Sequence, residues 1–106
     1  MMVKVIIIDP FKRQIYEKEI GQDNLQDMQG IVGGYIEASG VFENGDILYV
    51  DEEGLLKDNQ EFFKVSEINP DPLAGVGFIQ GYDNEWAGKD ATIDHLELAL
   101  KVEWGR

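Results

Sequence analysis

The side chains that could act as nucleophiles or general bases are few in this chain. There is no cysteine, the serine and threonine hydroxyls are those of Ser39, Ser66 and Thr92, and the one histidine is His95. Nucleophilic catalysis needs a hydroxyl or thiol activated by a neighbouring base, and none of these residues stands in a recognisable signature of such a pair. We therefore predict no catalytic residue and no enzyme, with His95 as a surface residue near the start of a helix.

The 21 Asp and Glu side chains could serve as acids, bases or metal ligands, but their number alone defines no site. The segment DNEWAG, Asp83 to Gly88, is similar to the first half of a calcium loop. Its fifth position is Ala87, and Ile93 and Asp94 occupy the region where the closing bidentate glutamate is needed. The absence of cysteine also excludes a thiolate metal site. The sequence thus predicts no metal site and no cofactor.

Two glycine-containing stretches raise the question of a ligand-binding loop. GVGFIQG, Gly75 to Gly81, departs from a dinucleotide-binding fingerprint because its third glycine comes one position late and no helix follows. In IVGGYIE, Ile31 to Glu37, the expected helix precedes the glycines and a strand follows, the reverse of phosphate-binding loops. We interpret Gly75–Gly81 as a glycine-containing strand and Gly33-Gly34 as a helix terminus. A pocket for a nucleotide-type ligand near these glycines is the alternative function.

The charge balance is the strongest global signal in the sequence. The formal net charge is −12, and it is uneven, because residues 1–20 carry +1 and the remaining 86 residues carry −13. Binding to duplex phosphates needs Lys and Arg to displace counterions, so we predict no direct binding to nucleic acid. Either the acidic surface serves solubility alone, or it imitates the phosphates that a nucleic-acid-binding protein expects.

The mimicry hypothesis assigns the binding surface to two acidic turns. The candidate residues are Asp51, Glu52, Glu53, Asp83 and Glu85, to which Trp86 is added as a large aromatic in an acidic loop. Large aromatics often anchor interfaces, but a tryptophan also has much apolar surface to bury. For Trp86 we favour a position folded back onto the core over presentation to a partner.

The first half of the chain reads as strands around one helix. Val3–Ile8 is a near-continuous β-branched run typical of a buried strand, and a turn at Pro10–Arg13 leads into a second strand in Gln14–Ile20. Apolar residues spaced by three and four predict a helix up to Val32, with Asp23 or Asn24 as its N-cap and Gly33 in the left-handed region at its end. Strands at Tyr35–Phe42 and Ile47–Val50 flank Asn44-Gly45, which predicts a type I′ hairpin turn.

The second half is less regular. Phe62–Val65 fits a short strand or a helix, Gly75–Gly81 a buried strand, and Tyr82–Asp90 a polar loop. Residues 96–104 fit both periods, and we predict a helix at Ile93–Leu100, capped by Thr92, followed by a strand at Lys101–Trp104. The whole is one α+β domain, residues 1–106, with a mostly antiparallel sheet of about five or six strands and two short helices.

Location in the cell follows from two absences in the sequence. No apolar run approaches the roughly 18 residues that a membrane span needs, and no signal-peptide cleavage pattern follows the first apolar stretch. The lack of cysteine fits a reducing compartment. We expect a cytoplasmic protein without membrane contact, and the residues leave its oligomeric state open.

Several quoted stretches together suggest a family. The chain combines MQGIVGGYIE, then NGDILYVDEEGLL, then FFKV, then PLAGVGFIQGYDNE, before a closing VEW. In these it resembles an uncharacterised family, domain of unknown function 3846, carried by bacteriophages, plasmids and other mobile elements. The resemblance implies an accessory protein that acts in the cytoplasm of a bacterial host by binding a host or phage protein. Trp86 departs from the pattern, since a second glycine after the acidic pair would be more usual there.

Overall fold

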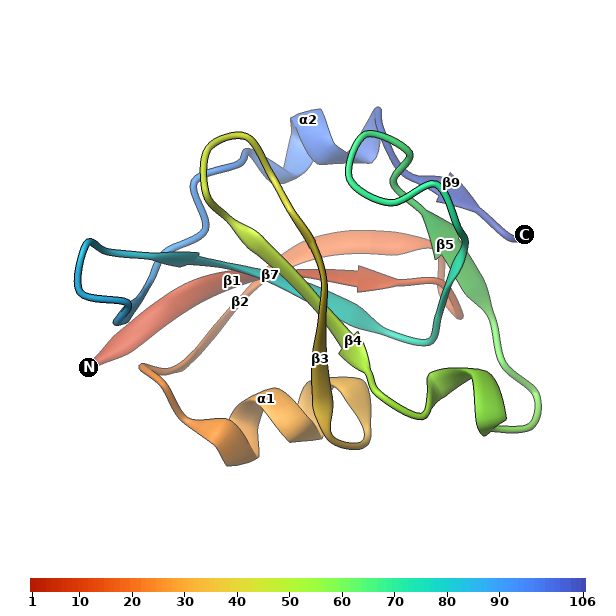
Figure 1. Cartoon of the computed structure of the whole chain (residues 1–106), viewed down its shortest axis with the longest axis horizontal. Helices are drawn as coiled ribbons and strands as arrows, with labels where there is room; N and C mark the ends of the chain where they lie inside the picture. Colours follow the sequence, from red (N-terminus) through yellow and green to blue (C-terminus); the bar gives the residue numbers. More distant parts are fainter.

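The computed structural model describes all residues, 1–106. Its main element is a six-stranded sheet that is covered on both faces. Figure 1 shows helix α1 (Leu25–Val32) below the main sheet, and helix α2 (His95–Ala99) with a small second sheet above it. The fold is α+β with two short helices, as predicted, and every strand pair is antiparallel. Neither helix has the length and apolarity needed to span a membrane.

The main sheet has the strand order β2-β1-β7-β4-β3, with β8 paired to β7, and the small sheet has the order β6-β5-β9. The strands of the main sheet are β1 (Met2–Asp9), β2 (Gln14–Gly21), β3 (Ile36–Val41), β4 (Ile47–Asp51), β7 (Gly77–Tyr82) and β8 (Gly88–Lys89). The small sheet consists of β5 (Phe62–Lys64), β6 (Leu73–Ala74) and β9 (Glu103–Trp104), and a 3₁₀ turn, η1, covers Gly54–Leu56.

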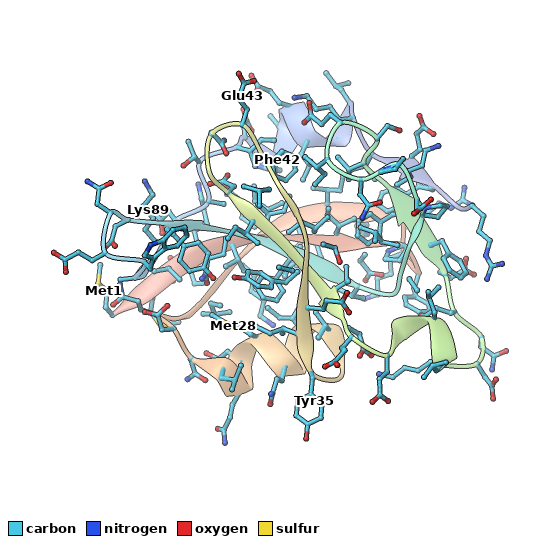
Figure 2. All side chains as sticks on the ribbon, in the orientation of Figure 1. Met1, Met28, Tyr35, Phe42, Glu43 and Lys89 are labelled. Atoms are coloured by element: carbon cyan, nitrogen blue, oxygen red, sulfur yellow. The ribbon has the colours of Figure 1, made fainter.

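Side chains of a strand alternate between the two faces of the sheet, so the continuous apolar run of β1 contributes to a core on each face. Ile6 and Ile8 join the core under the small sheet and α2, together with Leu48, Phe63 and Leu98. The residues of β1 on the other face join the core under α1, which contains Val3, Val5, Ile7, Ile20, Met28, Val32 and Phe78. In Figure 2, Met28 lies between α1 and the sheet, whereas Tyr35, just after α1, points away from the molecule.

Helix α1 begins and ends as its residue types dictate. Asn24 is the N-cap, and its side-chain oxygen accepts a hydrogen bond from the Asp27 amide at 3.0 Å. Asp23, the other candidate cap, has a φ of 55° and binds elsewhere. Gly33 ends the helix with a φ of 81°, and its amide donates to the Gln29 carbonyl, which confirms the predicted left-handed terminus.

The hairpin at Asn44-Gly45 exists, but its turn is not the predicted type I′. A type I′ turn needs positive φ at both central residues, and only Gly45 (φ 93°) has it. The Phe42 amide donates to the Asp46 carbonyl and the Gly45 amide to the Phe42 carbonyl, so the loop has three residues. Such a loop places its one left-handed residue last, where glycine fits without strain.

Other predicted elements hold with corrected bounds. Phe62–Lys64 is a strand, and the buried strand predicted at Gly75–Gly81 begins at Gly77. The predicted polar loop Tyr82–Asp90 contains strand β8 and is therefore a hairpin. The predicted C-terminal helix is shortened to α2, and its cap is Asp94, whose carboxylate accepts from the Leu96 amide. Thr92 does not cap it, because the helix begins three residues later, at His95. The Thr92 amide instead donates to the buried carboxylate of Asp46.

Candidate binding surface

The first acidic turn does not present Asp51 to solvent. Asp51 ends β4 with its carboxylate buried, where it forms an ion pair with Lys57 and accepts a hydrogen bond from the Glu53 amide at 2.9 Å. Burial acts to raise the pKa of Asp51, but the hydrogen bonds from Lys57 and Glu53 and the charge of Lys57 outweigh it, and the pKa is lowered. Asp51 is therefore a structural carboxylate, and the exposed acids of this turn are Glu52 and Glu53.

Gly33-Gly34 packs against this ion pair. The Lys57 ammonium donates to the Gly33 carbonyl at 2.7 Å, and a Cβ on residue 34 would lie 2.6 Å from an oxygen of Asp51. The close approach that Gly34 permits is therefore to a side chain of the protein. The nearest surface hollow measures about 100 Å³ and is lined by nine residues, among them Glu37, Asp51 and Leu73.

The second acidic turn forms the tip of the β7–β8 hairpin, residues 83–87, which we call the hairpin tip. The Asp83 carboxylate accepts from the amides of Glu85 (2.8 Å) and Ala87 (3.0 Å), and the Asp83 amide donates to the Ala87 carbonyl. Asp83 thus shapes the turn, as Asp side chains commonly do. Glu85 and Trp86 are left exposed at its end.

Trp86 is 74% exposed, so the interpretation that placed it in the core is wrong. The hairpin tip lies at the left edge of Figure 1, beside the N-terminus. Trp86 also has a φ of 63°, the left-handed conformation that costs a residue with a Cβ about 1–2 kcal/mol and that glycine or asparagine usually adopts. The aromatic ring it contacts is Tyr82, with ring centroids 6.2 Å apart and planes at 49°.

Tyr82 connects the hairpin tip to the middle of the sheet. Its hydroxyl forms a 2.6 Å hydrogen bond with the hydroxyl of Tyr49 on β4, and the Tyr49 ring stacks on Phe78. Burial and this hydrogen bond raise the pKa of Tyr82 well above its ordinary value, so the phenol stays neutral throughout the physiological range. The aromatic row Phe78, Tyr49, Tyr82 and Trp86 therefore leads from the α1-side core to the surface.

Polar side chains of the β2–α1 connection hold the base of the hairpin. The Asp23 carboxylate accepts from the Gly88 amide at 3.0 Å, and the Gln22 amide group donates to the Gly88 carbonyl at 2.8 Å. Gln80 lies fully buried beside them, and neither its amide nitrogen nor its oxygen has a hydrogen-bond partner. The hairpin is thus fastened to the N-terminal side of α1.

The structure separates the six predicted binding residues into two groups. Continuing the β4–β7 register places Asp51 level with Val76, seven residues before Asp83, which corresponds to about 23 Å along the strand. Asp83, Glu85 and Trp86 come together at the hairpin tip, whereas Asp51, Glu52 and Glu53 lie at the opposite end of the sheet. Sequence reasoning missed Asp23, Tyr49 and Tyr82. The period-two spacing of Phe78, Gln80 and Tyr82 was the signal for one shared face.

The residues considered for chemistry lie apart from the hairpin tip. His95 is half-buried at the start of α2, with Nδ1 3.6 Å from a Glu17 oxygen and 3.7 Å from an Asp94 oxygen. No three Asp, Glu or His side chains converge in a way that could hold a metal ion. The two larger hollows measure about 270 and 440 Å³, and both are open to solvent, one beside α2 and one beside β8 and the N-terminus.

Comparison with known protein families gives a match over most of the chain. The model of the family described as Domain of unknown function (DUF3846) matches residues 3–99. This range extends from β1 to the end of α2, so that β9 is the one strand outside it. No curated protein and no solved structure matches the chain.

Proposed function

This chain belongs to the family Domain of unknown function (DUF3846), and from that premise we propose that it acts by binding a macromolecular partner through the hairpin tip. The partner is a protein of a bacterial host, or of the phage or other mobile element that carries the gene. The protein performs no catalytic step of its own in this proposal, and it acts in the host cytoplasm as an accessory factor.

The exposed ring of Trp86 carries the proposal. A tryptophan at a left-handed position that faces solvent opposes both the backbone preference for glycine and the tendency of large aromatics to be buried. The fold gains little from the ring, since its aromatic contact is with Tyr82 alone. Tryptophan is, however, among the residues that most often supply the binding energy of an interface. A role in recognition accounts for both features.

Imitation of nucleic acid is the finer form of the proposal. A net charge of −12 favours a partner with a basic binding surface, and such a partner is normally occupied by phosphates. The exposed acids available for this at the two ends of the sheet are Asp83 and Glu85 on one side and Glu52 and Glu53 on the other. Double-stranded DNA should then compete with the protein for its partner.

A quantitative pull-down from lysate of the natural host tests the proposal. The baits are the unaltered chain, Trp86→Gly, Trp86→Phe and, as a matched control, Leu56→Ser, which removes an 81% exposed apolar side chain at the other end of the sheet. Capture of a specific protein should fall about tenfold or more with Trp86→Gly, the scale of an anchor residue, and persist with Trp86→Phe and Leu56→Ser.

Equal capture by all four baits would contradict a role of the hairpin tip. Added duplex DNA that leaves the captured protein in place would contradict the mimicry form alone. Thermal stabilisation by a nucleotide, together with no Trp86-dependent capture, would instead favour the small-ligand function, because a ligand at 100 times its Kd stabilises by about 2.7 kcal/mol.

A further inference from the structure

We propose that the hairpin tip recognises a positively charged side chain, an arginine or lysine of a basic protein segment, on the exposed face of Trp86 beside Tyr82. This inference rests on the proposed function and names the chemistry of the partner. It follows from the geometry of the two aromatic rings, from the negative charge of the surrounding side chains, and from the position of Lys89 on the other face of the hairpin.

The aromatic geometry suits a cation. Trp86 offers the ring type that binds cations best, and the Tyr82 ring lies beside it, with ring centroids 6.2 Å apart and ring planes at 49°. Tyr82 is held in place by its 2.6 Å hydrogen bond to Tyr49 and remains a neutral phenol. A cation–π contact forms within about 6 Å of a ring centroid, and most of the Trp86 surface is open to solvent.

The charges around the pair are negative. Glu85 and Asp83 belong to the same turn, and Asp23 lies near enough for its charge to act on Tyr82. Such a rim attracts a cation and repels phosphate, because like charges oppose approach. A basic peptide therefore fits this surface, whereas a nucleic acid does not.

The basic side chains of the protein that could bind this aromatic face do not occupy this place. Lys89 is the basic residue of the hairpin, and Figure 2 shows it at this end of the molecule. Lys89 pairs with Gly81 and Gly88 with Tyr82, so the Lys89 side chain belongs to the face opposite Tyr82. The cation–π contact that the chain makes itself is between Arg106 and Phe62, with the guanidinium carbon 4.0 Å from the ring centroid, at the small sheet. The aromatic face at Trp86 is thus left for a partner.

The surface is also organised before binding. Asp83 fixes the turn by two hydrogen bonds, and Asp23 and Gln22 hold Gly88 at its base. A rigid aromatic loses little conformational entropy on contact, which favours binding even when the contact area is small.

Two-dimensional NMR of the intact chain tests the inference, because Trp86 and Trp104 give separate indole N–H signals that Trp86→Phe assigns. The probe is a glycine-spaced peptide with three arginines, and the control peptide carries citrulline, which has nearly the shape of arginine but no charge. The arginine peptide should shift the Trp86 signal more than that of Trp104, and the citrulline peptide should shift neither.

Variants separate a specific site from general attraction to an acidic protein. Trp86→Asn, which tolerates the left-handed backbone, should weaken arginine-peptide binding about two- to fivefold, and Trp86→Phe should retain most of it. Glu85→Gln should weaken binding more than Glu52→Gln, although both remove one negative charge. Equal effects of Glu85→Gln and Glu52→Gln, or shifts that do not favour Trp86, would overturn the inference.

The result stands apart from that of the pull-down. If capture from lysate depends on Trp86 while the arginine and citrulline peptides bind alike, the proposed function holds and the cationic recognition is wrong. A larger Trp86 shift with single-stranded DNA than with the arginine peptide would also overturn the inference and would identify nucleic acid as the partner.

Discussion

At the scale of single residues, the first acidic turn shows that neighbouring carboxylates can have different roles, one structural and the others exposed to solvent. Asp51-Glu52-Glu53 is uniform in charge along the chain, and the charge pattern does not distinguish its first member. In the folded chain Asp51 faces inward against Gly34 and Lys57, while Glu52 and Glu53 face solvent. Lys57, the ion-pair partner of Asp51, follows η1. It also donates to the carbonyl of Gly33 at the end of α1, which is 24 residues earlier in the chain.

Replacement of Asp51 by asparagine should destabilise the protein in a pH-dependent way. At pH 7 the change removes the ion pair with Lys57 and weakens the bond from the Glu53 amide, and we expect a loss of about 1–3 kcal/mol in the free energy of unfolding. The pKa of Asp51 is lowered in the folded chain, so its contribution is present above the unfolded-state pKa and is lost as pH falls through the folded-state pKa. Urea unfolding at pH 7 and pH 3 measures the difference.

The neighbouring exposed acid provides the control for this experiment. Glu52→Gln removes the same charge one residue later and should change stability by less than about 0.5 kcal/mol. If Asp51→Asn costs as much at pH 3 as at pH 7, the ionised carboxylate is not what stabilises this end of the sheet.

Trp86 marks a limit of sequence reasoning at this scale. Its place in a turn could be predicted from the polar residues around it, but its exposure depends on how the β7–β8 hairpin lies in the folded chain. Burial of a side chain is decided by its neighbours in three dimensions, and the aromatic neighbours here, Tyr82 and Tyr49, are 33 residues apart in the chain.

At the scale of elements, long apolar runs were predictable, and of the two-residue strands only β9, Glu103–Trp104, falls within a predicted strand, Lys101–Trp104. Strands β1 and β2, helix α1 and the β3–β4 hairpin are confirmed. Each has a local signal in the sequence: the β-branched run of β1, the turn before β2, the three-and-four spacing of α1 and the Asn44-Gly45 dipeptide of the hairpin. Strands β6 and β8 have two residues each and show no period. They exist because a neighbouring strand offers its edge. The site depends on such a strand, because β8 closes the hairpin that carries Trp86.

Two glycines of α1 and its exit should respond to alanine in opposite ways. Gly30 lies inside the helix with nothing within 4 Å of where a Cβ would stand, so Gly30→Ala should stabilise the protein by about 1 kcal/mol. Gly34→Ala would place a Cβ 2.6 Å from the Asp51 carboxylate and should destabilise it by about 1–3 kcal/mol. Thermal or urea unfolding of the two variants measures both effects.

The double variant Gly34→Ala with Asp51→Asn tests the cause of the second effect. If the methyl group acts by displacing the Asp51 carboxylate, the two changes together should cost less than the sum of the single changes, because they disrupt the same contact. Additive costs would show that Gly34 is required for another reason.

At the scale of the whole molecule, the fold class follows from features that act along the entire chain. Strand β1 is buried on both faces, so the sheet needs a covering element on each face. The two predicted helices provide this cover, because α1 contributes to one core and α2 to the other. The division into a main and a small sheet was not predictable, because β5 pairs with β6 and β9, and β9 lies about forty residues further along the chain. Such pairings depend on the folded core and leave no local mark.

The net charge of −12 predicts how salt changes stability and binding. Two like charges 10 Å apart in water repel by about 0.4 kcal/mol, and salt at about 0.15 M screens interactions beyond about 8 Å. Relief of several such repulsions should raise the free energy of unfolding by on the order of 1 kcal/mol between 10 and 200 mM NaCl, with little further change above that. Urea unfolding across this range measures the effect, and its early saturation distinguishes screening from the general stabilisation that concentrated salts produce.

Association with a basic partner should respond to the same salt in the opposite direction. Attraction between an acidic surface and a basic one accelerates encounter, and screening removes that gain, so the association rate should fall steeply over the range in which stability rises. The cation held on Trp86 is in close contact and is screened less, so the dissociation rate should change little. Stopped-flow measurement with the arginine peptide gives both rates. A stability that falls with salt would show that the exposed ion pairs, such as that of Lys4 with Glu17, outweigh the repulsion among the carboxylates.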